Sequence, residues 1–159
     1  MLINRKKIVV FGGTSGIGKA VCNILVKKNA SKIFAISRNP KKFKNVKKPI
    51  EIIKMNVLDD FEVKNFFKNL GKYDVLINTA TGGERALGSF QNMSLDGYRN
   101  SFRKLWGYTN TVRYGLKTLS KEGCIVLVSG SPARRAKEGQ IALAIPEEED
   151  QLTIWSSTQ

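Results

Sequence analysis

The chain has 159 residues, of which 42% are hydrophobic and 25% are charged, enough for one domain with a buried core. No apolar stretch approaches the roughly 20 residues of a membrane-spanning helix, so we expect no membrane partner. Lys and Arg outnumber Asp and Glu by 27 to 13, and the net charge of +14 attracts polyanions such as a phosphate-bearing cofactor, nucleic acid or acidic lipid. The alternative is a lysine-rich surface without a specific partner. Because no aromatic residues alternate with the cations, nucleic acid is not the partner we expect.

Five short runs that are apolar and rich in β-branched residues predict β-strands. They cover residues 7–11, 32–37, 50–55, 74–79 and 124–129. Helical patterns separate most of these runs, and such an alternation is typical of a parallel sheet with helices on both faces. We therefore predict an α/β fold, a Rossmann-like doubly wound parallel sheet of about five strands. It would occupy residues 1–146 as a dinucleotide-binding domain, followed by an acidic, irregular tail over residues 147–159.

Three segments have the periodicity of amphipathic helices. The first has an apolar face of Ile17, Val21, Ile24 and Leu25. The second begins with a capping box of Asp59 and Glu62 and stops at Gly71, and the third runs from about Ser94 to Lys121. Between the predicted elements, the cationic loop 39–49 has room for no more than a turn or two of helix. The long loop 80–93 follows a strand, where ligands bind in open α/β sheets.

A glycine-rich turn connects the first predicted strand to the first helix. Gly12, Gly16 and Gly18 let the chain reverse tightly, let a pyrophosphate approach the backbone, and let the helix pack close to the strand. The start of the helix then offers unpaired N–H groups and a positive dipole to phosphates. With these glycines, the candidate cofactor-binding residues of the turn are Thr14, Ser15 and Ile17. The alternative is a plain turn without a ligand.

The end of the second strand predicts which dinucleotide is bound. An NAD site usually has a carboxylate here that accepts a hydrogen bond from the ribose 2′-hydroxyl. This chain has Ser37 followed by Arg38, which can bind a 2′-phosphate bidentately, and Lys41 and Lys42 add to the positive field. NADP is therefore favoured over NAD. The alternative is that Arg38 is an exposed loop cation.

Together, four segments resemble the short-chain dehydrogenase/reductase family over residues 5 to about 145. They are VVFGGTSGIG (9–18), the pair Asn56-Val57, INTAT with Asn78 and Ala80, and CIVLVSGSP (124–132). The resemblance implies that Asn56 and Val57 line an adenine pocket and that Asn78 and Ala80 lie beside the cofactor. It also implies hydride transfer between NADP(H) and a carbonyl or alcohol, in which a serine orients the substrate carbonyl, a tyrosine is the acid and a lysine holds the ribose.

The sequence departs from the family's pattern at the catalytic residues. No tyrosine of the chain has a lysine four residues later, so the family's Tyr-x-x-x-Lys motif is absent. The family's serine position falls at Gly130, with Ser129 and Ser131 as stand-ins, and the asparagine of the fourth helix is replaced by Lys104. Ser131 and Lys104 are therefore the candidate catalytic residues. Lys104 would act as a proton donor or phosphate contact, and the alternative is that it lies on a solvated helix face.

These departures predict weak or absent catalysis and leave two alternatives open, a non-catalytic dinucleotide-binding module or a truncated product. The resemblance implies further elements after residue 145, which IPEEEDQLTIWSSTQ does not supply, so we expect a shortened family member whose substrate the sequence does not identify. The sequence leaves the oligomeric state open, with a homo-oligomer as one alternative. With no histidine and two distant cysteines, we expect no metal site. Cys22 and Cys124 fit buried thiols in a reducing cytoplasm.

Overall fold

The computed structural model describes residues 2–81, 86–129 and 155–156. Five strands run parallel: β1 (Lys7–Phe11), β2 (Lys32–Ser37), β3 (Ile50–Lys54), β4 (Tyr73–Asn78) and β5 (Leu119–Leu127). A sixth strand, β6 (Trp155–Ser156), pairs antiparallel with β5, and the order in the sheet is β3-β2-β1-β4-β5-β6. The expected Rossmann-like parallel sheet is confirmed. Except for β6, the predicted tail over residues 147–159 lies outside the described residues.

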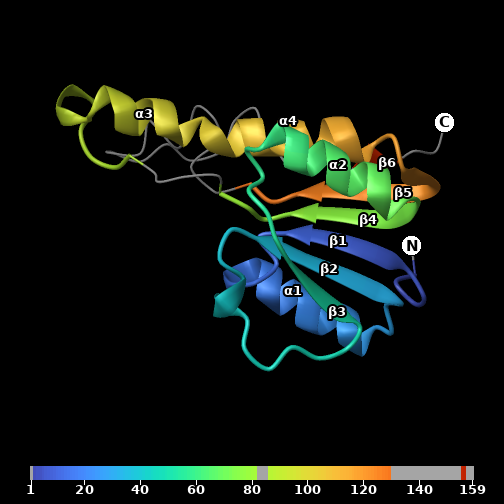
Figure 1. Ribbon diagram of the computed structural model, residues 1–159. Coiled ribbons are helices and arrows are strands. Elements are labelled where there is room, and N and C mark those ends of the chain that lie inside the picture. The colour runs from blue at the N-terminus through green and yellow to red at the C-terminus, as the bar shows by residue number, and fades with distance from the viewer. Residues whose placement is uncertain (1, 82–85, 130–154, 157–159) are drawn as a thin grey trace.

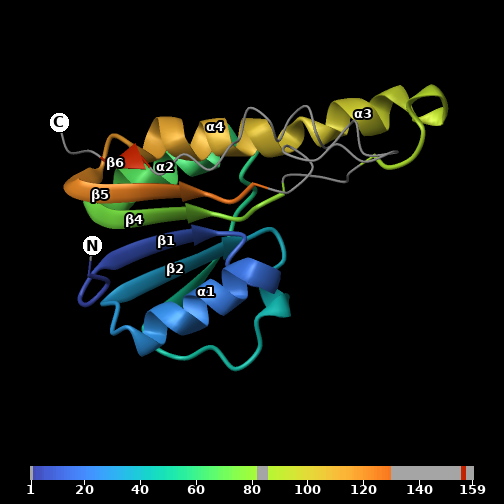
Figure 2. The same ribbon diagram turned by 180° about the vertical axis from the view of Figure 1, so that it is seen from behind.

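Helices cover both faces of this sheet (Figure 1). They are α1 (Gly16–Lys27), α2 (Asp60–Leu70), α3 (Leu95–Ser101) and α4 (Arg103–Gly115), with short 3₁₀ turns η1 (Pro40–Lys42) and η2 (Phe90–Asn92). One face is covered by α1 and the other by α2 and α4. The preceding helix α3 lies roughly in line with α4 and extends beyond the edge of the sheet (Figures 1 and 2). No helix in the described ranges has the length and apolar character needed to span a membrane.

The core has two layers because alternate residues of a strand point to opposite faces of the sheet. In β1, Ile8 and Val10 pack with Cys22 and Leu25 of α1. Val9 and Phe11 point the other way and pack with residues of α2, among them Phe67. All four of these β1 residues are buried, as expected for the central strand of a sheet covered on both faces. The two layers hold the carboxyl ends of the parallel strands together at one edge.

The helix expected from Ser94 to Lys121 is instead two helices followed by the start of a strand. At Phe102 the N–H donates to the carbonyl of Arg99 at 3.2 Å, an i to i−3 bond that tightens the chain and separates α3 from α4. The helix then ends at Gly115, and β5 begins at Leu119, five residues before the predicted strand. Apolar spacing alone did not reveal that Leu119 pairs with Tyr73 of β4.

The predicted apolar face of α1 is wrong at two positions. The side chains of Ile17 and Ile24 are 62% and 54% exposed, whereas the helix packs through Gly18, Cys22 and Leu25. The reason is the close approach of α1 to β1, which turns the small residues inward. The ends of α2, by contrast, are confirmed: the Asp59 carboxylate accepts from the Glu62 N–H at 2.9 Å, and the helix stops at Gly71, where φ is +68°.

Candidate functional site

A cavity of about 400 Å³ lies at the carboxyl ends of β1, β2 and β4. Residues from four segments line it: the turn after β1, the end of β2 with its following loop, the residues that follow β3, and the residues that follow β4. They are Phe11, Gly12, Thr14 to Gly18, Ile36 to Asn39, Lys42, Met55, Val57 and Thr79 to Thr81. The predicted residues Gly12, Thr14, Ser15, Gly16, Ile17, Gly18, Ser37, Arg38, Val57 and Ala80 therefore share one cavity.

The glycine turn brings the start of α1 against the end of β1. A Cβ on Gly18 would lie 2.3 Å from the carbonyl oxygen of Gly12, and a Cβ on Gly12 would lie 2.5 Å from Thr79 Oγ1. The N–H of Gly12 donates to the carbonyl of Ile36 at 2.8 Å, which attaches the turn to the end of β2. Only glycines permit this approach of turn, helix and strand.

Gly16 has a different role, because its backbone faces open space. Its φ is +47°, and a Cβ built on it would meet no atom within 4 Å, although the residue lines the cavity. The helix α1 begins at Gly16, and the side chain of its N-cap residue Ser15 makes no capping hydrogen bond. The first turn of α1 contains no acidic residue. The N–H groups at this helix start are therefore available to an anion in the cavity.

Thr14 connects the glycine turn to the end of β2. Its hydroxyl donates to the hydroxyl of Ser37 at 2.7 Å, and its side chain is 1% exposed. Beside this bond, the exposed cations Arg38 and Lys42 line the cavity, and none of the described lining residues carries a carboxylate. The site is therefore positive where β2 ends, which favours a ligand with a phosphate at this position.

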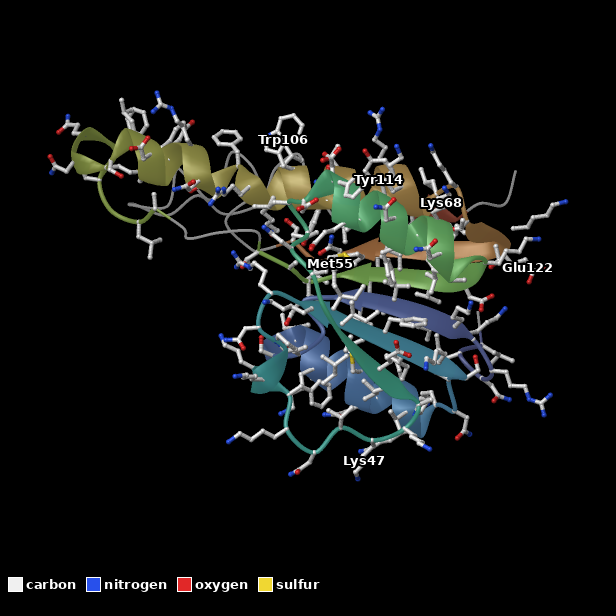
Figure 3. The ribbon with its side chains drawn as sticks, in the orientation of Figure 1. Lys47, Met55, Lys68, Trp106, Tyr114 and Glu122 are labelled. Atoms are coloured by element: carbon white, nitrogen blue, oxygen red, sulfur yellow. The ribbon has the colours of Figure 1, made fainter. Side chains whose placement is uncertain are left out.

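Asn56 does not line the cavity, although Val57 beside it does. The Asn56 side chain turns toward α2, where its Oδ1 accepts from the N–H of Leu58 at 3.2 Å. The Asn56 N–H donates to the carboxylate of Glu62 at 3.1 Å, so Asn56 forms part of the start of α2. Met55, at the end of the predicted third strand, lies in the cavity instead and was not singled out from the sequence. Figure 3 shows Met55 between the two groups of helices.

Asn78 is fully buried and acts on the cavity through its neighbours. Its Nδ2 donates to the hydroxyl of Thr111 on α4 at 2.9 Å, and its Oδ1 accepts from the N–H of Ala80 at 2.9 Å. These bonds fix Ala80, which lines the cavity, relative to α4. Thr79, which sequence reasoning missed, lines the cavity and donates its hydroxyl to the carbonyl of Phe11 at 2.9 Å.

The two candidate catalytic residues are not brought into this cavity among the described residues. Lys104 is 5% exposed, and its Nζ lies 5.4 Å from the centre of the Tyr108 ring. The Tyr108 hydroxyl donates to the carbonyl of Val128, just after β5. Lys104 therefore does not lie on a solvated helix face, while its neighbours Arg103 and Trp106 do. Ser131 lies outside the described residues, and no group that could hold a metal occurs in the described part of the chain.

Comparisons with known proteins agree with this arrangement. Residues 6–143 match the family described as short chain dehydrogenase. A short chain dehydrogenase from Burkholderia cenocepacia J2315, solved in complex with NADP, is similar with a TM-score of 0.84, 20% identity, and coverage of 93% of this chain and 63% of that one. A short-chain type dehydrogenase/reductase from Mycobacterium ulcerans has a TM-score of 0.84, 18% identity and coverage of 94% and 60%. A small-chain dehydrogenase in complex with NADPH has a TM-score of 0.72, 23% identity and coverage of 91% and 60%.

The chain thus spans less than two thirds of the length of these three solved structures. No curated protein sequence matches it significantly. At these identities the structural similarity shows the fold, and the match of the family over residues 6–143 covers most of the chain. The sequence match, the strand order and the glycine turn lead to the same conclusion: the chain belongs to the short-chain dehydrogenase family and has a Rossmann-like fold.

Proposed function

We propose that this chain binds NADP(H) in the cavity at the carboxyl ends of β1 and β2, in preference to NAD(H). The observation that carries the proposal is the cationic end of β2: Arg38 and Lys42 line the cavity, and no carboxylate does so among its described lining residues. A carboxylate there would repel a 2′-phosphate, whereas a guanidinium binds one bidentately. Two structurally similar dehydrogenases were solved with NADP and NADPH, which supports the same choice.

The residues of the cavity fit such a dinucleotide. The open backbone at Gly16 and the uncapped start of α1 would receive the pyrophosphate. Ser37, Arg38 and Lys42 would hold the 2′-phosphate, and the buried side chains of Met55 and Val57 would contact the adenine. In this assignment Asn56 is replaced by Met55 as an adenine contact. In this assignment Asn78 positions Ala80 through its hydrogen bond to the Ala80 N–H, on the side away from the cavity, and does not contact the ligand.

The reaction we propose for the family member is hydride transfer between NADP(H) and a carbonyl or alcohol. Bound NADPH would supply the hydride. The chain would supply a group that orients the substrate oxygen, for which Ser131 is the candidate, and a proton donor, for which Lys104 is the candidate. We propose that this chain catalyses the reaction weakly or not at all, because the sequence has no tyrosine followed by a lysine four residues later.

A non-catalytic dinucleotide-binding module is the second candidate function. Lys104 favours it, because this side chain is 5% exposed and does not line the cavity. The buried lysine then stabilises α4 through its contact with the Tyr108 ring of the same helix and transfers no proton.

Titration of the purified chain with NADPH and, separately, with NADH tests the binding proposal. We expect NADPH to bind at least about tenfold more tightly, the discrimination of one charge-assisted contact. Arg38→Asp should remove that preference and leave NADH binding in place. Arg113→Asp, an exposed arginine on α4, has the same change of charge and should leave the preference unchanged. Equal affinity for NADPH and NADH in the unchanged chain would contradict the proposal.

Oxidation of NADPH in the presence of a panel of aldehydes and ketones separates the two functions. We expect turnover at or near background with retained NADPH binding. Clear carbonyl reduction that Ser131→Ala or Lys104→Met abolishes, without loss of NADPH affinity, would contradict weak catalysis and establish these residues as catalytic.

We also propose a cytoplasmic location. The support is that Cys22 and Cys124 are both free thiols, as expected in a reducing compartment. Fractionation of cells that produce the full chain tests this location.

A further inference from the structure

The excess of positive over negative charge lies almost entirely in the first part of the chain. Residues 1–50 carry 13 Lys and Arg and no Asp or Glu, whereas residues 51–159 carry 14 Lys and Arg and all 13 Asp and Glu. The first 50 residues therefore account for +13 of the net charge of +14. They form β1, α1, β2 and the loop to β3, which lie together as one lobe, blue to cyan in Figures 1 and 2. The excess charge is thus a property of one side of the molecule.

Most of these cations lie on one surface, which we call the basic face. It consists of the outer side of α1 and the loop from Arg38 to Lys48, which runs beside α1 (Figure 2). Phe43 of the loop packs against α1, because its ring lies 5.2 Å from the Nζ of Lys19 and belongs to the same core cluster as Cys22. The exposed cations of the basic face are Lys27, Lys28, Arg38, Lys41, Lys42, Lys44, Lys47 and Lys48. Figure 3 shows Lys47 at the outer margin of the molecule.

Apolar side chains are exposed among these cations. Ile17 and Ile24, seven residues apart on α1, are 62% and 54% exposed, and Val46 of the loop is 39% exposed. The aromatic ring of this loop, Phe43, is 6% exposed and thus not available for stacking. A nucleic acid would leave Ile17, Ile24 and Val46 in water and would find no exposed ring on the described basic face. A lipid surface can accept both the cations and the aliphatic side chains.

We propose that the basic face binds the surface of a membrane that contains anionic lipids. The cations would lie at the level of the headgroup phosphates and carboxylates, where clusters of four to eight Lys and Arg bind acidic lipid. Ile24 and Val46 would enter the boundary between headgroups and acyl chains, which an amphipathic helix reaches without crossing the bilayer. This peripheral contact replaces the expectation of no membrane partner, which rested only on the lack of a spanning segment. The described helices provide no membrane span.

The test separates this surface from the proposed cofactor site. Arg38, Lys42 and Ile17 line the cavity, so they are left unchanged. Lys44, Lys47 and Lys48 belong to the basic face without lining the cavity and are replaced together by Gln. The matched control replaces three exposed lysines of the other lobe, Lys64, Lys68 and Lys72, by Gln, with the same change in net charge. All of these side chains are exposed, so both variants are expected to fold, which circular dichroism checks.

Co-sedimentation of the full chain with phosphatidylcholine vesicles, with and without phosphatidylserine, is the measurement. We expect binding only when phosphatidylserine is present, and weaker binding as salt is raised. The variant of Lys44, Lys47 and Lys48 should bind about 100-fold more weakly, because each cation near an anionic surface contributes roughly fivefold. The variant of Lys64, Lys68 and Lys72 should bind like the unchanged chain. Equal losses in the two variants, or no binding of the unchanged chain, would overturn the proposal.

A second pair of variants distinguishes a lipid surface from another polyanion. Ile24→Gln removes an exposed apolar side chain of the basic face, and Leu116→Gln removes one directly after α4 that is 41% exposed. Only Ile24→Gln should weaken vesicle binding, and neither should change binding to a duplex DNA of arbitrary sequence. Tight DNA binding without vesicle binding would overturn the proposal in favour of a nucleic acid. If the unchanged chain binds vesicles but does not prefer NADPH over NADH, the membrane proposal stands and only the proposed cofactor is contradicted.

Discussion

The hydroxyl of Thr14 donates a 2.7 Å hydrogen bond to the hydroxyl of Ser37, joining the glycine turn after β1 to the last residue of β2. Thr14 is 1% exposed, so this bond is largely shielded from water on its side. The same turn is tied to β2 by the N–H groups of Gly12 and Gly13, which both donate to the carbonyl of Ile36. The position of Arg38 at the cavity therefore depends on a connection between two segments that are distant in sequence.

Thr14→Val keeps the shape of the side chain and removes this connection. We expect the free energy of unfolding to fall by about 1 kcal/mol, the usual contribution of one hydrogen bond, and NADPH to bind more weakly. Thr118→Val is the control, because the Thr118 hydroxyl is buried without a hydrogen-bond partner among the described residues. Its removal should leave stability unchanged or raise it. Urea unfolding of both variants checks the pair, and an equal loss in both would contradict the role of Thr14.

Gly18→Ala and Gly16→Ala distinguish the two roles of the glycines, which are packing of α1 against β1 and access of the ligand to the backbone. The methyl group at position 18 would lie 2.3 Å from a backbone oxygen of Gly12, so α1 must move away from β1 and stability should fall by several kcal/mol. At position 16 the methyl meets no atom, and the positive φ costs only about 1–2 kcal/mol.

Dinucleotide titration completes this comparison. The methyl of Gly16→Ala would project where the backbone is open to the cavity, so we expect a folded chain with greatly reduced NADPH affinity. Full NADPH affinity in Gly16→Ala would show that the start of α1 does not receive the pyrophosphate.

Asp74 gives stability a dependence on pH. Its carboxylate accepts hydrogen bonds from the Lys7 N–H at 2.9 Å, the Lys6 ammonium at 3.1 Å and the Ser120 hydroxyl at 3.1 Å. Burial raises the pKa of Asp74, but these donors outweigh it, so the pKa lies below its ordinary value. The carboxylate therefore stabilises the fold above the pKa of the unfolded chain, and this stability is lost as pH falls through the folded pKa.

Asp74→Asn removes that contribution. At neutral pH we expect it to lower the free energy of unfolding by about 1–3 kcal/mol, and the difference should shrink as the pH falls. Asp96→Asn, at an exposed ion pair with Arg99, should cost no more than about 0.5 kcal/mol. Urea unfolding over a range of pH measures both, and a constant difference between Asp74→Asn and the unchanged chain would contradict the assignment.

The two thiols should react at different rates. Burial raises the pKa of the Cys22 thiol to about 12, and the side chain is fully buried under the glycine turn, where it donates to the carbonyl of Gly13. Cys124 on β5 is half-buried. A disulfide reagent should therefore label Cys124 first, and Cys124→Ser should react only when the chain unfolds. Rapid labelling of native Cys124→Ser would show that α1 opens without global unfolding.

The sheet was predictable because buried parallel strands are short apolar runs, and β1 and β2 match their predicted bounds. The start of β5 was not, since Leu119 lies in a polar stretch and is held by its pairing with Tyr73, a contact between distant parts of the chain. The same limit applies to α1: Ile17 and Ile24 fit an apolar face, but the close approach at Gly18 decides which side is buried.

The site was predictable where backbone chemistry dictates the residue type. Gly12, Gly16 and Gly18 stand where the turn needs them, and Arg38 follows β2 directly. Asn56 illustrates the opposite case. Its amide can bond to a nearby N–H as easily as to a ligand, and the neighbouring start of α2 uses it for that purpose. Met55 and Thr79 have no sequence signal beyond their places at the ends of strands.

The central place of β1 has a consequence for the order in which the chain folds during synthesis. Ile8 pairs on one side with Ile33 of β2 and on the other with Val75 of β4, so one edge of β1 must wait until β4 has left the ribosome. Until then an apolar strand has an open edge that invites pairing with other nascent chains. Arg5, Lys6 and Lys7 lie directly before the buried part of β1, where charges act as gatekeepers against aggregation. The cations before β1 thus protect this strand from aggregation while it waits for its second neighbour.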